Sequence, residues 1–190
     1  GLGDGPGFRR RWRTRNCASE IGLENHWIRM ESELKLRRKW TFQAQDKQIV
    51  LVKKHYEKSA HVLMKGFMWA LYLPYYPNLT VEVAVGDRYK PDVVAVDDLG
   101  KPQFWGEAGQ ITVQKIRSLL RRYRATHVAI AKWQTPLSPY IRIVTEALDG
   151  LKRERPVDLI NFQKDSAQRF IDENGRITIN HDLLNWVRLK

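Results

Sequence analysis

The stretch Tyr89 to Gln110, which reads YKPDVVAVDDLGKPQFWGEAGQ, decides the fold of this chain. Val93 to Val96 form a short apolar run, and Gln103-Phe104-Trp105 opens a second segment with strand character. The residues between them, Asp97-Asp98-Leu99-Gly100-Lys101, have the composition of a tight turn. We therefore predict two adjacent antiparallel strands joined by this turn.

Each of these two predicted strands carries one carboxylate. Asp92 lies near the start of the first strand, and Glu107 lies along the second. In an antiparallel pair these positions can lie close together, and paired carboxylates offer the oxygen ligands that a hard cation such as Mg²⁺ prefers. The alternative is that both acids are solvated charges beside a turn, and the pattern alone leaves the two interpretations open.

The order of these residues resembles the PD-(D/E)xK nuclease-like superfamily, in which Pro-Asp, a hairpin turn and a second acid follow one another. The chain is more similar to the small bacterial YaeQ family, whose second motif also runs Trp, one residue, Glu, one residue, Gly-Gln, as in Trp105 to Gln110. YaeQ-like proteins also carry a glutamate in a helix before the Pro-Asp strand, and Glu57 occupies that place. The resemblance covers roughly residues 40–135.

The resemblance implies an α/β fold with a mixed central sheet flanked by helices. Its core is restriction-endonuclease-like, with the element order αβββαβ. It also implies that Glu57, Asp92 and Glu107, together with the backbone carbonyl of Ala108, bind Mg²⁺ or Mn²⁺. The metal would polarise a nucleic-acid phosphodiester and lower the pKa of an attacking water.

One position departs from the superfamily pattern. The lysine expected two residues after the second acid is Gly109 in this chain. Gln110, which the resemblance places in the catalytic group, can donate a hydrogen bond to a water or a phosphate oxygen but carries no charge. We therefore expect metal-dependent nuclease activity that is at most weak.

The same departure supports an alternative function. In this alternative the protein is a catalytically inactive subunit that keeps the nuclease fold and binds RNA or DNA within a larger protein assembly.

A predicted helix over residues 56–73 places Glu57, His61 and Lys65 on one face, since they are four residues apart. These side chains form either a solvated, ion-paired stripe or a functional face in which Glu57 points over the sheet towards the metal.

A second predicted helix is capped by Thr112, runs to about Tyr123 and carries no acid. Its basic residues and the one that follows it are Lys115, Arg117, Arg121, Arg122 and Arg124. These side chains are either ordinary solvated charges or a surface that neutralises several phosphates. Lys115 could also swing towards the sheet and replace the missing lysine in space.

The chain as a whole is basic, with 33 Lys and Arg against 21 Asp and Glu and a net charge of +12. This balance favours polyanionic partners, nucleic acid first. We predict a basic, partly disordered extension over residues 1–38 and one nuclease-like domain over residues 39–190. Arg9, Arg10 and Arg11 of the extension are candidate nucleic-acid contacts; the extension also fits an organelle-targeting remnant, or a segment before a native start at Met30.

Several classes of protein are disfavoured. No apolar run approaches the roughly 18 residues that span a membrane, so we expect a soluble protein of the cytoplasm or an organelle matrix, not a secreted one. The single cysteine, Cys17, excludes an internal disulfide and a cysteine-based zinc site.

The remaining segments complete the predicted fold. We expect a hairpin over residues 40–52, a strand over 79–85, a buried and parallel strand over 127–132, a helix over 140–151, a strand over 156–162, an Asn-Gly hairpin over 170–179 and a closing helix over 181–189.

Overall fold

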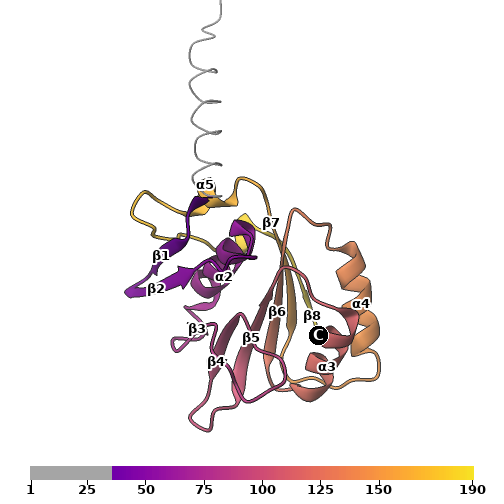
Figure 1. Ribbon diagram of the computed structural model, residues 1–190. Helices are drawn as coiled ribbons and strands as arrows, with labels where there is room; N and C mark the ends of the chain where they lie inside the picture. The colour runs from indigo at the N-terminus through magenta and orange to yellow at the C-terminus, as the bar shows by residue number, and fades with distance from the viewer. Residues whose placement is uncertain (1–35) are drawn as a thin grey trace, which may run out of the picture. The chain divides into compact units, whose positions relative to one another are not determined.

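The structure is a computed structural model that describes residues 36–190 (Figure 1). The predicted basic extension, with Arg9, Arg10 and Arg11, lies outside these residues except for its last few positions. The described part contains a two-stranded sheet, a six-stranded sheet and the helices that pack against them.

The six-stranded sheet is mixed, as predicted. Its strands, in spatial order, are β3 (Thr80–Val81), β4 (Val93–Val96), β5 (Pro102–Ala108), β6 (His127–Trp133), β7 (Val157–Phe162) and β8 (Asn185–Leu189). The three central strands β5, β6 and β7 are parallel, and β3, β4 and β8 pair antiparallel to their neighbours. The order α2-β3-β4-β5-α3-β6 is the expected αβββαβ order.

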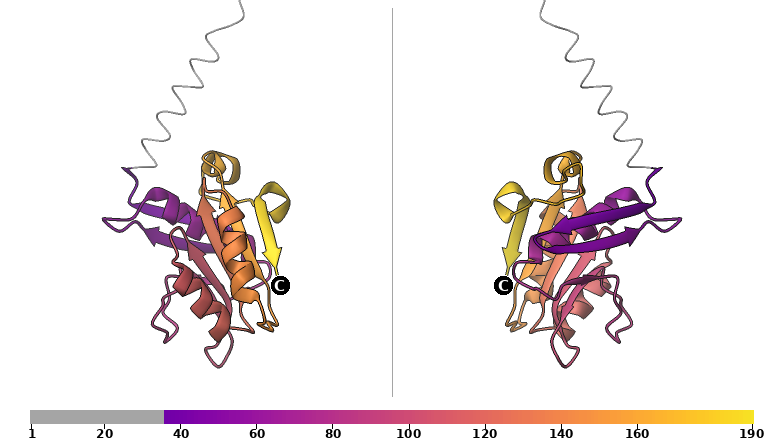
Figure 2. Two further views of the ribbon diagram at one scale, coloured as in Figure 1. Left: turned by 90° about the vertical axis from the view of Figure 1, so that its right-hand side faces the viewer. Right: turned by 90° about the vertical axis from the view of Figure 1, so that its left-hand side faces the viewer.

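One face of the sheet is covered by α2 (Ser59–Tyr72), which is buried along most of its length because a hairpin covers its other side. This hairpin, β1 (Lys39–Ala44) and β2 (Lys47–Val52), confirms the predicted pair. Contact between the layers is close, since a Cβ added to Gly66 of α2 would lie 2.6 Å from a ring carbon of Phe42. The views in Figure 2 show the hairpin over this side of the sheet.

The opposite face is covered by α3 (Val113–Arg122) and α4 (Ser138–Leu148). Ile116, Leu119 and Leu120 of α3 pack with Val144 of α4 against Trp105 and the parallel strands. As predicted, the side chain of Thr112 caps α3 by accepting a hydrogen bond from the Lys115 amide. The strand β6 is buried and parallel to β5, which confirms the predicted buried and parallel strand.

Several predicted elements were wrong in extent or type. The strand expected over residues 79–85 is only Thr80–Val81, because Glu82 adopts a left-handed conformation with φ 57°. The Asn-Gly hairpin is reduced to a single bridge between Ile171 and Ile177, after a short helix α5 (Ser166–Phe170).

The predicted closing helix was also wrong. A single 3-10 turn, η1 (His181–Leu183), is followed by β8. Pairing with β7 satisfies backbone groups that would otherwise be left at an open sheet edge.

Candidate functional site

Glu57 lies in the turn before α2, so the prediction that places it within the helix was wrong by two residues. Its carboxylate still faces the helix. Oε1 accepts a hydrogen bond from Lys65 Nζ at 2.5 Å and lies 2.7 Å from His61 Nδ1, while Oε2 accepts from the Lys54 amide at 3.0 Å. Burial alone would raise the pKa of Glu57, but the bonds from Lys65 and Lys54 outweigh it and hold the pKa below its usual value.

Lys65 is the cation at the centre of this cluster. It is 1% exposed, and its ammonium lies between Glu57 Oε1 and Glu82 Oε1, the latter at 2.6 Å. Burial opposes the charged form, yet hydrogen bonds to the two glutamates raise the pKa of Lys65. Lys65 therefore occupies the space between two carboxylates as a permanent cation, and it is not part of a solvated stripe.

Sequence reasoning missed Glu82, which reaches Lys65 from the irregular segment after β3. It was assigned to a strand, where its side chain would have been an ordinary exposed charge. The only signal in the sequence was a lysine at position 65 among apolar helical residues, because such a lysine needs an acidic partner from elsewhere in the fold.

His61 connects the turn of Glu57 to the predicted Pro-Asp strand. Its Nε2 lies 3.4 Å from Asp92 Oδ1, and its Nδ1 contacts Glu57. Burial lowers the pKa of His61, but Asp92 and Glu57 outweigh it and raise the pKa. Asp92, which directly precedes β4, also accepts a hydrogen bond from the Ala108 amide at 2.8 Å; burial would raise its pKa, but its bond with His61 and this amide bond lower it.

Glu107 lies on β5, and its carboxylate is fully engaged by other side chains. Oε1 accepts a hydrogen bond from Trp105 Nε1 at 2.7 Å, and Oε2 accepts from Lys115 Nζ at 2.6 Å. Burial raises the pKa of Glu107, and Lys115 and Trp105 offset only part of this effect. Trp105 and Glu107 share the face of the sheet that α3 covers, because alternate strand residues point the same way.

The three predicted acids are thus brought into one region, but each is already satisfied by the protein. Glu57 binds Lys65, Asp92 binds the Ala108 amide and Glu107 binds Lys115. Within residues 36–190, no group of three or more His, Cys, Asp or Glu side chains is placed to hold a metal ion. As arranged, these residues do not fit a divalent cation, which needs several carboxylate or carbonyl oxygens directed at one point. The metal role of Glu57, Asp92, Glu107 and the Ala108 carbonyl stays a prediction.

A cleft of about 710 Å³ opens beside this cluster. Glu57 and His61 line one side, and Gly109 and Gln110 line the end of β5. Gln110 is exposed there, and its catalytic role stays a prediction.

Lys132 also lines the cleft, and sequence reasoning placed it within a buried strand without any role. It is 4% exposed, donates a hydrogen bond to the Gly109 carbonyl at 2.5 Å, and lies 4.0 Å from the ring centroid of Tyr140.

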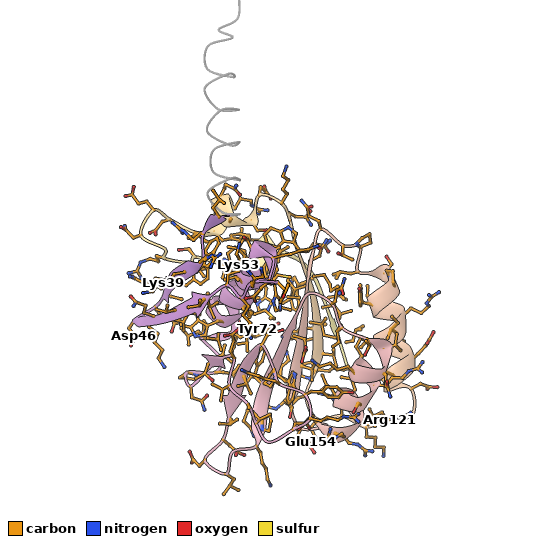
Figure 3. The ribbon with its side chains drawn as sticks, viewed as in Figure 1. Lys39, Asp46, Lys53, Tyr72, Arg121 and Glu154 are labelled. Atoms are coloured by element: carbon orange, nitrogen blue, oxygen red, sulfur yellow. The ribbon has the colours of Figure 1, made fainter. Side chains whose placement is uncertain are left out.

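The arginines of α3 and Arg124, which follows the helix, form a separate, exposed surface. Arg117 pairs with Glu146 at 3.6 Å, and Arg122 pairs with Asp87. Arg121 and Arg124 are exposed and form no ion pair with an acid among residues 36–190. Figure 3 shows Arg121 at the periphery of the domain, far from the interior position of Tyr72. Lys115 differs from these arginines, because it turns inward to Glu107.

A second polar cluster, which the sequence did not reveal, lies at the C-terminal end of α2. Asp158 is fully buried and accepts hydrogen bonds from Tyr72, His127 and Arg188 at 2.6–2.8 Å. Burial would raise its pKa, but these bonds lower the pKa of Asp158 well below its usual value. The cluster ties α2, β6, β7 and β8 together.

No protein-family model and no curated protein matches the chain. Solved structures of YaeQ proteins are similar to it. The YaeQ protein from Pseudomonas syringae is 14% identical with a TM-score of 0.54, over 72% of this chain and 77% of that one. The YaeQ protein from Xanthomonas axonopodis pv. citri is 17% identical with a TM-score of 0.47, over 65% and 72%.

The architecture defines a mixed α/β protein whose six-stranded sheet is flanked by helices. Its similarity to the Pseudomonas syringae structure shows that this fold is YaeQ-like. No helix among residues 36–190 is long and apolar enough to cross a membrane.

Proposed function

We propose that the protein binds nucleic acid, RNA or DNA, through the exposed arginines of α3 and through Arg124, which follows it. The observation that carries this proposal is the state of Arg121 and Arg124, which are exposed and have no acidic partner in the described part of the chain. Solvated arginines of this kind are free to exchange counterions for phosphates, which is the main source of affinity for nucleic acid.

The charge of the whole chain supports the same proposal. A net charge of +12 attracts a polyanion at long range, and it does so before any specific contact forms. Arg117 and Arg121 lie one helical turn apart, about 6 Å along the axis, so both can reach the same backbone. The pairing of Glu57, Asp92 and Glu107 with groups of the protein itself favours binding without metal-dependent cleavage. A role within a larger assembly is compatible with this function.

The test is binding of a labelled duplex at several salt concentrations, measured by fluorescence anisotropy. The double variant Arg121→Gln/Arg124→Gln should bind more weakly, with a salt slope lower by about two. The matched control Lys101→Gln/Arg176→Gln removes the same charge from other exposed sites and should change affinity much less. The proposal would be refuted if both double variants lost the same affinity for the duplex, or if the native chain did not bind it.

Metal-dependent hydrolysis of phosphodiesters is a second candidate, and one observation favours it. The backbone amide of Ala108 donates a hydrogen bond to the Asp92 carboxylate, and Glu107 is the residue directly before Ala108. The two acids are therefore both next to the peptide bond between Glu107 and Ala108. Activity would require Lys115 to leave Glu107.

Incubation of single- and double-stranded DNA and RNA with Mg²⁺ or Mn²⁺ tests this candidate. We expect no cleavage beyond that of an Asp92→Ala variant. Cleavage that the variant loses would establish the nuclease in place of the binding protein.

A further inference from the structure

Lys132 is a buried lysine without an acidic partner among residues 36–190. Lys65 and Lys115, two other lysines beside the predicted acids, both bind carboxylates. An ammonium has three donors, and the carbonyl of Gly109 takes one of those of Lys132. A cation held out of water without a counter-charge is costly, so an anion that enters the cleft gains a preformed partner.

The acid in the same cleft does not supply that counter-charge. Glu57 lines the cleft, but its carboxylate is bound by Lys65 and contacted by His61. The glycine at position 109 keeps the cleft open beside α2, since a Cβ there would lie 3.6 Å from His61 and Met64. The cleft therefore offers a positive group at its floor to a ligand that brings its own negative charge.

Aromatic side chains line the same cleft as this cation. Tyr140 of α4 lies against the Lys132 ammonium, and Trp133 is the next residue on β6. On the opposite side, Tyr56 is 95% exposed, more than any other large hydrophobic residue of the described chain. An exposed tyrosine beside a cleft loses little on stacking against a flat ligand, and every nucleobase offers such a face.

We infer that this cleft binds an unpaired stretch of nucleic acid, with a phosphate at Lys132 and bases stacked on Tyr56 and Tyr140. The inference rests on the proposed function and names its substrate class, because only a single strand exposes its bases to aromatic side chains. A duplex keeps its bases stacked inside and contacts the arginines of α3 instead.

The experiment compares a short fluorescein-labelled single-stranded DNA with the duplex of the same sequence, using the full chain and fluorescence anisotropy. Tyr56→Ala should weaken single-strand binding about tenfold and leave duplex binding within about twofold. The matched control is Tyr75→Ala, which removes another exposed tyrosine (65%) at the far end of α2 and should change neither affinity.

A second pair of variants tests the cation. Lys132→Met keeps the buried stem without the charge, and it should weaken single-strand binding with a salt slope lower by about one. Lys101→Met, which removes an exposed charge from the turn between β4 and β5, should have little effect.

The outcomes separate this inference from the proposed function. If duplex binding depends on Arg121 and Arg124 but Tyr56→Ala is inert or weakens both ligands equally, the cleft inference is wrong and the proposed function stands. The same holds if Lys132→Met and Lys101→Met lower single-strand affinity equally. If the native chain binds neither ligand, both are wrong.

Discussion

Lys65 Nζ lies 2.5 Å from Glu57 Oε1, and this ion pair is almost completely buried at the base of the predicted acid cluster. The same ammonium binds Glu82 at 2.6 Å, so one cation bridges two acids from the segments before and after α2. The pair fixes the turn of Glu57 against the helix, and it takes the place that a metal would need between these two carboxylates.

Replacing Lys65 with methionine should therefore destabilise the fold. Lys65→Met leaves Glu57 buried without its cation, and breaking a buried pair in this way costs about 3 kcal/mol. Urea denaturation followed by circular dichroism measures the change. The control Lys58→Met alters an exposed lysine beside α2 and should be nearly neutral. The triple variant Lys65→Met/Glu57→Gln/Glu82→Gln removes the uncompensated acids as well, so it should recover part of the lost stability. If Lys65→Met were as stable as the native chain, the ion pair would not stabilise the fold.

Glu107 and Lys115 form the second ion pair of the region, and the effects of their substitutions on the free energy of unfolding should be coupled. Each of Glu107→Gln and Lys115→Met removes one partner of a bond of 2.6 Å, with both side chains at least three-quarters buried. We expect the double variant to lose less stability than the sum of the single losses, by about 1 kcal/mol. A double-mutant cycle in urea measures this coupling, and strictly additive losses would show that the two residues do not interact in solution.

The sequence predicted the elements whose signals are local. The strands β4 and β5 follow from a short apolar run, a turn and a second segment with strand character, and α3 follows from its cap. The partners of the acids could not be predicted in this way. Glu82 reaches Lys65 from a segment whose backbone turns left-handed at Glu82, and Lys132 lies in the cleft because β6 ends beside Gly109, which is distant in sequence.

The last strand shows a different limit. Residues 185–189 are short and mixed in character, so their periodicity does not separate a helix from a strand. Their conformation is decided by the free edge of β7 and by the bonds between Arg188 and Asp158, which join positions 30 residues apart. Long-range pairing of this kind leaves no trace in a local pattern.

Asp158 should make stability depend on pH in the acid range. Its pKa is lower in the folded chain than in the unfolded one, so its contribution is complete above the unfolded pKa of about 4 and is lost as pH falls towards the folded pKa. The free energy of unfolding of the native chain should exceed that of Asp158→Asn by about 3 kcal/mol near neutral pH. This difference should shrink below about pH 4. Urea denaturation of both proteins across pH measures it. The control Asp165→Asn alters an acid that is half exposed and should show a small difference at every pH. A native advantage that grows on acidification would contradict this linkage.

Gly66 allows the hairpin to lie close on α2, and a methyl group at this position should separate them. A Cβ there would meet Phe42 ring carbons at 2.6 and 2.7 Å, far inside van der Waals contact, and both residues are enclosed by the core. Overpacking of this kind costs about 1–3 kcal/mol, so Gly66→Ala should lower the urea midpoint although alanine favours a helix. Phe42→Leu removes the ring that clashes, so Gly66→Ala should cost less in the Phe42→Leu background than in the native one. If alanine stabilised the chain equally in both backgrounds, the hairpin would not pack on α2 at this distance, and the burial of Lys65 beneath it would lose its explanation.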